Sequence, residues 1–268
     1  MGRHRAVSTQ PARVHRDGAP RAGAAPPGAA ILSDSSAPTP QNSWTVLGPL
    51  LCRRLLALPG GSKATAMVKQ LSEGPLWLGM DSLQGDQIAD RRFHGGPDRT
   101  LCHYPTQHYA YWAQRFPQLR TQFGLGAFGE NLGSESLNEE RLCIGDRLRW
   151  GDAVIEVSQP RSPCVKLDNR LGIRGLAREL SLSGRTGWLY RTIEEGIVHP
   201  GDGMQLLERP HPDISVAHLW RCFLNPSLDE ETLLRLAELP RLVLHFQAAF
   251  RQRYDAGRRQ RDQHSLFG

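Results

Sequence analysis

The chain has 268 residues, of which 39% are hydrophobic and 22% charged, a composition that excludes disorder of the whole chain. It contains no run of about 18 consecutive apolar residues, so we expect a soluble protein without a membrane partner. The net charge is +6, but residues 1–43 and 251–268 each hold five Arg and two Asp. Residues 44–250 are therefore neutral, and a specific nucleic-acid partner is not expected.

Residues 1–43 are rich in Ala, Pro, Gly, Ser and Arg and contain few large apolar side chains. Such a segment cannot bury enough surface to offset its chain entropy, so we predict a disordered N-terminal extension. Its composition is similar to that of organelle transit peptides, but we favour a variable or wrongly assigned N-terminal extension over a targeting role. With no secretory signal and no CxxC or CxxxC spacing among the five cysteines, we expect a reducing, cytoplasmic environment.

Residues 44–209 consist of short apolar runs separated by Gly, Pro, Asp or Asn. Two segments, 106–116 and 171–180, have the apolar spacing of helices. The pattern predicts a mainly β fold with inserted helices, a barrel or a sandwich, and Gly-Asp pairs at 145–146, 151–152 and 201–202 indicate tight turns. The runs predicted as strands are 45–52, 64–69, 76–78, 147–150, 153–157, 188–193 and 204–207.

Residues 210–255 have a different pattern, with apolar residues at i, i+3 and i+4. We predict a three-helix segment, in which Ser227 caps the second helix and Pro240 begins the third. Residues 256–268 are predicted to be a flexible basic tail. The three-helix segment is a candidate for homodimer contacts. The predicted helices are 215–223, 229–239 and 241–253.

The densest cluster of candidate functional residues directly follows the predicted strand 153–157. Cys164 lies there on a loop stiffened by Pro160 and Pro163, between the cations Arg161 and Lys166. Nearby cations favour the thiolate, which is the form that attacks electrophiles or binds a metal. The cluster indicates a soft metal ligand or a nucleophile, and a proline-rich turn with a buried cysteine is the alternative.

Other candidate clusters are less specific. The segment 94–99 has adjacent glycines that let the backbone approach a ligand, and the segment 128–132 places an acid beside an amide; either is also typical of a turn. His103 and His108 are five residues apart, which misses the spacing of two helical metal ligands, so we predict a core or pocket-wall role. We interpret Cys102, Cys143 and Cys222 as structural.

The order of these clusters resembles the MOSC-domain family, named after the C-terminal domain of molybdenum-cofactor sulfurases. The resemblance covers roughly residues 45–255 and is greatest to the bacterial YiiM-like branch, which protects against 6-hydroxylaminopurine and related compounds. The N-terminal extension has no counterpart in it. The motifs are Gly85-Asp86, His94-Gly95-Gly96-Pro97-Asp98-Arg99, His103-Tyr104-Pro105, His108-Tyr109, Tyr111-Trp112, Phe128-Gly129-Glu130-Asn131-Leu132, Ile144-Gly145-Asp146 and Ser158-Gln159-Pro160-Arg161-Ser162-Pro163-Cys164-Val165-Lys166-Leu167.

The resemblance implies a β-barrel that binds a molybdenum cofactor (molybdopterin), with Cys164 as the protein ligand of the metal. It implies reduction of N-hydroxylated small molecules, with electrons from a separate reductase. A non-catalytic carrier of the cofactor or of sulfur is the alternative function. The residues that the resemblance implies for cofactor binding are Lys69, His94, Arg99, Glu130, Asn131, Arg161 and Lys166.

Overall fold

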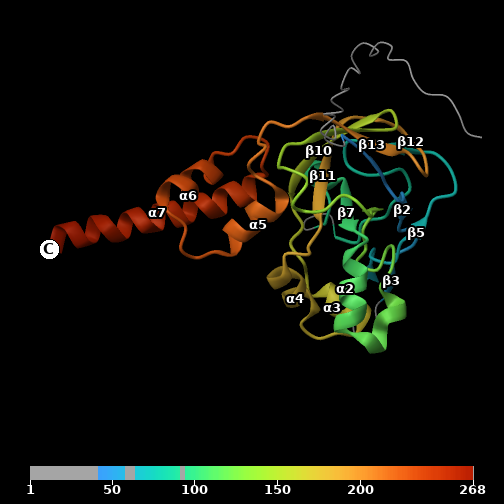
Figure 1. The fold of residues 1–268 in the computed structure, drawn as a ribbon, viewed down its shortest axis with the longest axis horizontal. Helices are drawn as coiled ribbons and strands as arrows, with labels where there is room; N and C mark the ends of the chain where they lie inside the picture. The colour runs from blue at the N-terminus through green and yellow to red at the C-terminus, as the bar shows by residue number, and fades with distance from the viewer. Residues whose placement is uncertain (1–41, 58–63, 91–93, 268) are drawn as a thin grey trace, which may run out of the picture. The chain divides into compact units, whose positions relative to one another are not determined.

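The computed structural model describes residues 42–57, 64–90 and 94–267 (Figure 1). Within these residues, seven strands form the main sheet, in the order β1-β13-β9-β10-β11-β7-β8. Beyond β1, Leu47 exchanges two backbone hydrogen bonds with Gly133 of β8, so the two edges meet and the sheet is a nearly closed barrel. The strands are β1 (Ser43–Thr45), β7 (Leu101–Pro105), β8 (Leu132–Ser134), β9 (Arg147–Trp150), β10 (Ala153–Pro160), β11 (Trp188–Glu194) and β13 (Gly203–Glu208).

In the described part of the chain, three two-stranded pairs accompany the barrel. They are β12 (Gly196–Val198) with β6 (Leu76–Leu78), β2 (Leu50–Leu51) with β5 (Gln70–Leu71), and β3 (Leu56–Ala57) with β4 (Ala64–Thr65). The predicted mainly β fold with inserted helices is confirmed, although the predicted runs 45–52 and 64–69 form shorter strands.

The Gly-Asp turns are confirmed by backbone geometry. Gly145, Gly151 and Gly201 all have positive φ. At Gly151 the turn joins β9 to β10, and a Cβ there would lie 2.6 Å from the Ile197 carbonyl oxygen, so only glycine fits.

Helices α2 (His108–Arg115), α3 (Lys166–Leu171) and α4 (Leu176–Ser183) contribute to a second apolar core. Its centre is Phe128, whose ring contacts those of Tyr104, Tyr109 and Trp112. The single predicted helix 171–180 is wrong: Gly172 and Gly175 have positive φ and end one helix before the next begins. The Asp168 carboxylate accepts hydrogen bonds from the N–H groups of Gly175 and Ala177, which fixes this break.

The three predicted C-terminal helices are present as α5 (Val216–Leu224), α6 (Glu230–Ala237) and α7 (Leu244–Phe267). Ser215 caps α5, and Val216 N donates to Leu142 O of the barrel domain at 2.9 Å. Two details of the prediction are wrong. Asp229, not Ser227, caps α6 by accepting from Thr232 N, and α7 begins four residues after Pro240.

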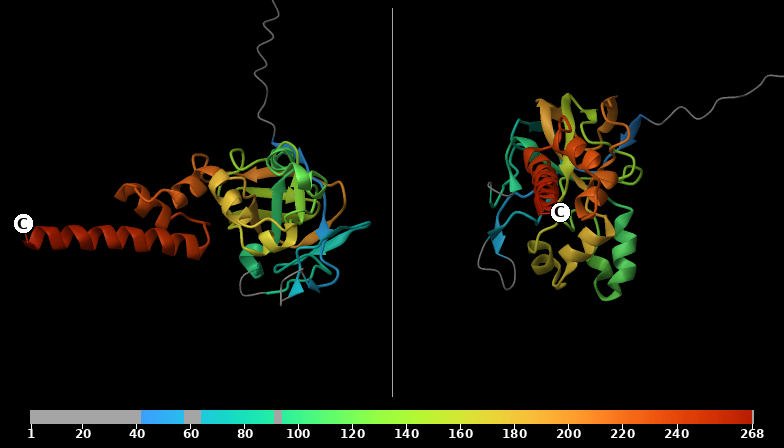
Figure 2. Two further views of the ribbon diagram at one scale, coloured as in Figure 1. Left: turned by 90° about the horizontal axis from the view of Figure 1, so that it is seen from below. Right: turned by 90° about the vertical axis from the view of Figure 1, so that its left-hand side faces the viewer.

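The two ends of the chain differ from the expectation. Asn42 accepts a hydrogen bond from Leu206 N and Ser43 pairs with Gln205 in the sheet, whereas residues 1–41 of the predicted extension lie outside the described residues. A flexible tail from residue 256 was predicted, whereas α7 continues as one helix to Phe267 (Figure 2). Among the helices of the described residues, none combines the length and the apolar character that a membrane span requires.

His103 lies fully buried between β11 and β8, and its pH response is predictable. Its Nε2 is 2.8 Å from Ser134 Oγ and its ring stacks on Trp188. Burial lowers the pKa of His103 to about 3, whereas the unfolded chain titrates near its ordinary value, about 6.5. Below about pH 6.5 the unfolded chain binds a proton at this histidine, and the folded protein does not. The free energy of unfolding therefore falls as the pH drops from about 6.5 towards 3.

We expect His103 to remove about 2 kcal/mol of unfolding free energy between pH 7 and pH 5. Urea unfolding of the wild type and of His103→Gln at both pH values measures this contribution of His103 to the unfolding free energy. The variant should be less stable at pH 7 but should lack this part of the pH dependence. Equal pH dependence in the two proteins would contradict the assignment.

Candidate functional site

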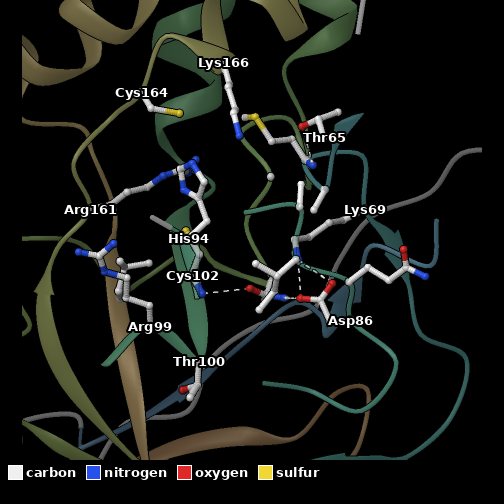
Figure 3. A pocket seen from close by; sticks show the side chains of 18 of the residues that line it. Thr65, Lys69, Asp86, His94, Arg99, Thr100, Cys102, Arg161, Cys164 and Lys166 are labelled. Carbon is white, nitrogen blue, oxygen red and sulfur yellow. Dashed lines mark hydrogen bonds and ion pairs between the residues drawn. The ribbon is translucent and has the colours of Figure 1, made fainter. Parts of the chain in front are cut away.

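A cavity of about 190 Å³ opens where the ends of β10 and β4 approach β7 and the segment 94–100 (Figure 3). Its floor is one cross-strand row: Gln159 pairs with Leu189, Leu189 pairs with Cys102, and Asn131 N donates to Cys102 O. All four residues line the cavity. The barrel therefore supplies a rigid floor, and loops supply the walls.

Cys164 lies on the wall formed by the loop that follows β10, as the sequence predicted. The residue is half-buried, and its sulfur faces the side of the cavity where Arg161, Lys166 and His94 lie (Figure 3). The loop is anchored at its base, because Arg161 N donates to Gly187 O at 3.0 Å. The thiol is thus accessible and held in position, and a guanidinium, an ammonium and an imidazole group lie on the same side of the cavity.

The nitrogen-containing side chains around Cys164 differ in charge and in hydrogen bonding. Arg161 Nη2 donates to Phe128 O at 2.5 Å, which fixes the guanidinium against the loop 126–131. Lys166 begins α3, and no carboxylate among the described residues pairs with its ammonium group. Partial burial and then the charges of Lys166 and Arg161 lower the pKa of His94, so this imidazole is neutral at pH 7. Arg99 lies on the same cavity wall.

Lys69 also lines the cavity, but its charge is already balanced. Lys69 Nζ lies 2.8 Å and 2.6 Å from the two carboxylate oxygens of Asp86, and both side chains are nearly buried. Asp86 also accepts from Cys52 N and from Asn131 Nδ2. Asp86 was absent from the candidate residues, and it is the group that holds Lys69 and Asn131 in place.

The amide of Asn131 is likewise engaged within the protein. Its Nδ2 donates to Leu50 O and to Asp86, and its Oδ1 accepts from Cys102 N. Both N–H donors are used, so the residue joins the floor to neighbouring segments and has no donor left for a ligand.

Glu130 does not lie on the cavity wall, unlike the other candidate residues. It is completely buried, and its carboxylate accepts hydrogen bonds from Tyr109 Oη and from the backbone N–H groups of Gly126 and Phe128. Burial, and then the neighbouring carboxylate, raise the pKa of Tyr109, which remains a donor. Glu130 therefore shapes the loop 126–131 that carries Asn131 into the cavity.

Replacing Glu130 by Gln should lower the unfolding free energy by about 2 kcal/mol, because one backbone N–H would face an amide N–H₂ instead of an oxygen. Tyr109→Phe removes only one of the three donors and should cost about 1 kcal/mol. Urea denaturation of both variants measures the difference. Equal or negligible losses would show that the carboxylate does not organise this loop.

Cys102 was interpreted as structural, yet it forms part of the cavity floor. Burial is the main cause that raises the pKa of Cys102, so it is a neutral thiol at pH 7. No local sequence feature indicates this position. Arg161, the cation that acts most strongly on the pKa of Cys102, is 59 positions away along the chain.

Comparison with known proteins connects this geometry to a family. A model of the MOSC domain matches residues 90–205, and a model of the YiiM-like, 3-alpha helix domain matches residues 214–257. Protein YiiM of Escherichia coli (strain K12) is 44% identical over 156 residues, which are 58% of this chain and 69% of that protein. A protein named Reductase from Gibberella moniliformis is 35% identical over 68% of this chain, but the match spans only 32% of that protein.

The fold agrees with these sequence matches. The crystal structure of YiiM from Escherichia coli matches with a TM-score of 0.65 at 36% identity, covering 70% of this chain and 89% of that chain. The crystal structure of YiiM from Geobacillus stearothermophilus gives a TM-score of 0.63 at 26% identity and covers 79% of this chain. The chain therefore belongs to the MOSC-domain family, in the branch that carries a YiiM-like three-helix domain.

Proposed function

We propose that this protein binds a molybdenum cofactor in the cavity beside Cys164 and reduces N-hydroxylated compounds of the hydroxylaminopurine type. The observation that carries the proposal is the position of the Cys164 thiol, half-buried on a cavity wall that also presents Arg161 and Lys166. Membership of the MOSC family and the relative named Reductase support it.

The residues around the cavity suit such a cofactor in their chemistry. A cysteine sulfur is a soft donor, of the kind that suits a thiol-rich molybdenum centre. Lys166, Arg161 and Arg99 are cations that would bind a phosphate group, and Arg does so with a planar fork of donors. Gln159 lines the cavity as well, and its buried amide N–H₂ group has no protein partner among the described residues.

When bound, the cofactor would supply the two-electron redox chemistry, and the chain supplies ligation, orientation and charge. Cys164 would be the protein ligand of the metal. Arg161, held by Phe128 O and Gly187 O, keeps a positive charge beside it without needing to reorganise. Neutral His94 can accept or donate a hydrogen bond at the cavity wall without adding a further charge.

Reduction of an N-hydroxyl group needs an electron donor. The reaction R–NH–OH + 2 e⁻ + 2 H⁺ → R–NH₂ + H₂O breaks the N–O bond and releases the oxygen as water. We propose a separate reductase as the source of these two electrons.

An assay with a chemical electron donor tests the activity without knowledge of the natural partner. Molybdenum-loaded protein, incubated with reduced methyl viologen and 6-hydroxylaminopurine, should form adenine, which chromatography detects. Protein freed of the cofactor is the control and should form none. Loaded protein that forms no adenine, with a stable +32 Da adduct on Cys164, would contradict the proposal and favour a sulfur carrier.

A further inference from the structure

Gln159 has an unusual position on β10. The strand pairs Val157 with Tyr190 and Gln159 with Leu189, so two steps along β10 match one step along β11. Ser158 is thus the extra residue of a β-bulge, a feature that redirects the side chains that follow it.

The bulge moves Gln159 to the other face of the sheet. In a regular strand Gln159 would share the face of Val157, which packs in the barrel core with Tyr190 and Trp188. With the bulge it shares the face of Leu189 and Cys102, which form the cavity floor. The strand therefore presents an amide to the cavity at a place where regular alternation would bury it in the apolar core.

The amide of Gln159 is buried but not satisfied. Gln159 is only 2% exposed, and its Nε2 has no hydrogen-bond partner among the described residues. An unpaired buried donor costs about 1–3 kcal/mol, so such a group is retained where a ligand or water pairs with it. Asn131, at the other end of the same row, has both N–H donors occupied.

We infer that Gln159, rather than Asn131, is the amide that binds the occupant of the cavity, donating from Nε2 to an acceptor atom on a planar heterocycle. The inference rests on the proposed function, which identifies that heterocycle as the pterin ring of the cofactor. The cations lie on the wall with Cys164, which suits phosphate, whereas the floor around Gln159 consists of Leu189 and the neutral thiol of Cys102. Such a floor suits the flat ring, with Gln159 marking its polar edge.

The variant Gln159→Met tests this inference because it has opposite effects on two measurable properties. Met has nearly the same length and shape but no donor, so the cofactor should dissociate about three- to tenfold faster. The cofactor-free variant should unfold at a temperature equal to or above that of the wild type, because it no longer buries an unpaired donor. Damage to the fold would instead lower both the retention of the cofactor and the unfolding temperature.

The experiment uses protein purified from a host that makes the cofactor, with molybdenum and pterin measured per chain over time after gel filtration. Gln159→Glu places an oxygen against the acceptor and should lose the cofactor faster than Gln159→Met. The matched control is Gln247→Met on α7, whose Nε2 already donates to Leu239 O at 2.7 Å. It should retain the cofactor as the wild type does and should unfold at a lower temperature.

The possible failures can be told apart. If the wild type carries molybdenum and Gln159→Met retains it equally, the inference is overturned and the proposed function stands. If retention is equal but KM for 6-hydroxylaminopurine rises, the amide binds the substrate ring, and the assignment to the cofactor is overturned. If wild-type protein carries no molybdenum, the proposed function fails and the inference fails with it.

Discussion

Cys164→Ser should lose bound molybdenum by about tenfold or more, and the reduction of 6-hydroxylaminopurine with it. A serine oxygen is a harder donor than sulfur and is not ionised at neutral pH, so it cannot replace the thiol as a ligand of the metal. The side chain is half-buried and similar in size, so the fold should not change. Metal analysis and the viologen assay on the same preparation give both readings.

The control for this variant is Cys222→Ser on α5. Cys222 is buried, and its sulfur lies beside His218 Nε2, outside the residues that line the cavity. This variant should keep its molybdenum and its activity. Retention of both by Cys164→Ser would contradict the assignment of Cys164 as the ligand.

Gly187→Ala should destabilise the protein by about 3–5 kcal/mol, the largest effect that we expect from a single methyl group. Gly187 has φ +71°, and a Cβ there would lie 2.2 Å from His103 O, which is backbone and cannot move aside cheaply. Gly187 also donates to Glu139 Oε1 and accepts from Arg161 N. A shift at this position would therefore also displace the loop that carries Cys164.

A second glycine, Gly184, separates the cost of the left-handed backbone from the cost of the close contact with His103 O. Gly184 has nearly the same φ, +70°, but a Cβ there would meet nothing within 4 Å. Gly184→Ala should cost about 1–2 kcal/mol, which is the left-handed backbone alone. Guanidinium unfolding of both variants measures the two costs, and equal losses would refute the role of the close approach to His103.

The features that sequence could predict are those encoded locally. The loop of Cys164 directly follows an apolar strand and carries its own prolines and cations, so its position at the end of β10 was correctly predicted. The turns at Gly145 and Gly151 follow from glycine conformation in the same way. Apolar spacing likewise revealed the three C-terminal helices.

The features that it could not predict depend on strand register and on contacts between distant segments. Lys69 and Asp86 form a buried ion pair, although they are 17 positions apart. Glu130 was placed with the ligand-binding residues by its motif, but the fold gives it three donors and no access to the cavity. Gln159 was not among the candidate residues, because the predicted strand ended at residue 157. In the structure β10 continues to Pro160, and the bulge at Ser158 turns Gln159 to the cavity side.

Helix ends show the same limit. Apolar periodicity continues through Gly172 and Gly175, yet both adopt positive φ and divide the predicted helix into α3 and α4. On α7 the charged sequence after residue 256 suggested a tail, but ion pairs such as that of Arg261 with Glu230 of α6 accompany its continuation as a helix. A pattern on one segment cannot reveal the partner that stabilises it.

The central claim is that the cavity beside Cys164 holds a molybdenum cofactor. The most direct test is the molybdenum and pterin content of wild-type protein purified from a host that makes the cofactor. We predict close to one molybdenum and one pterin per chain. Folded wild-type protein that contains neither, from a host in which a known molybdenum enzyme is fully loaded, would contradict the claim.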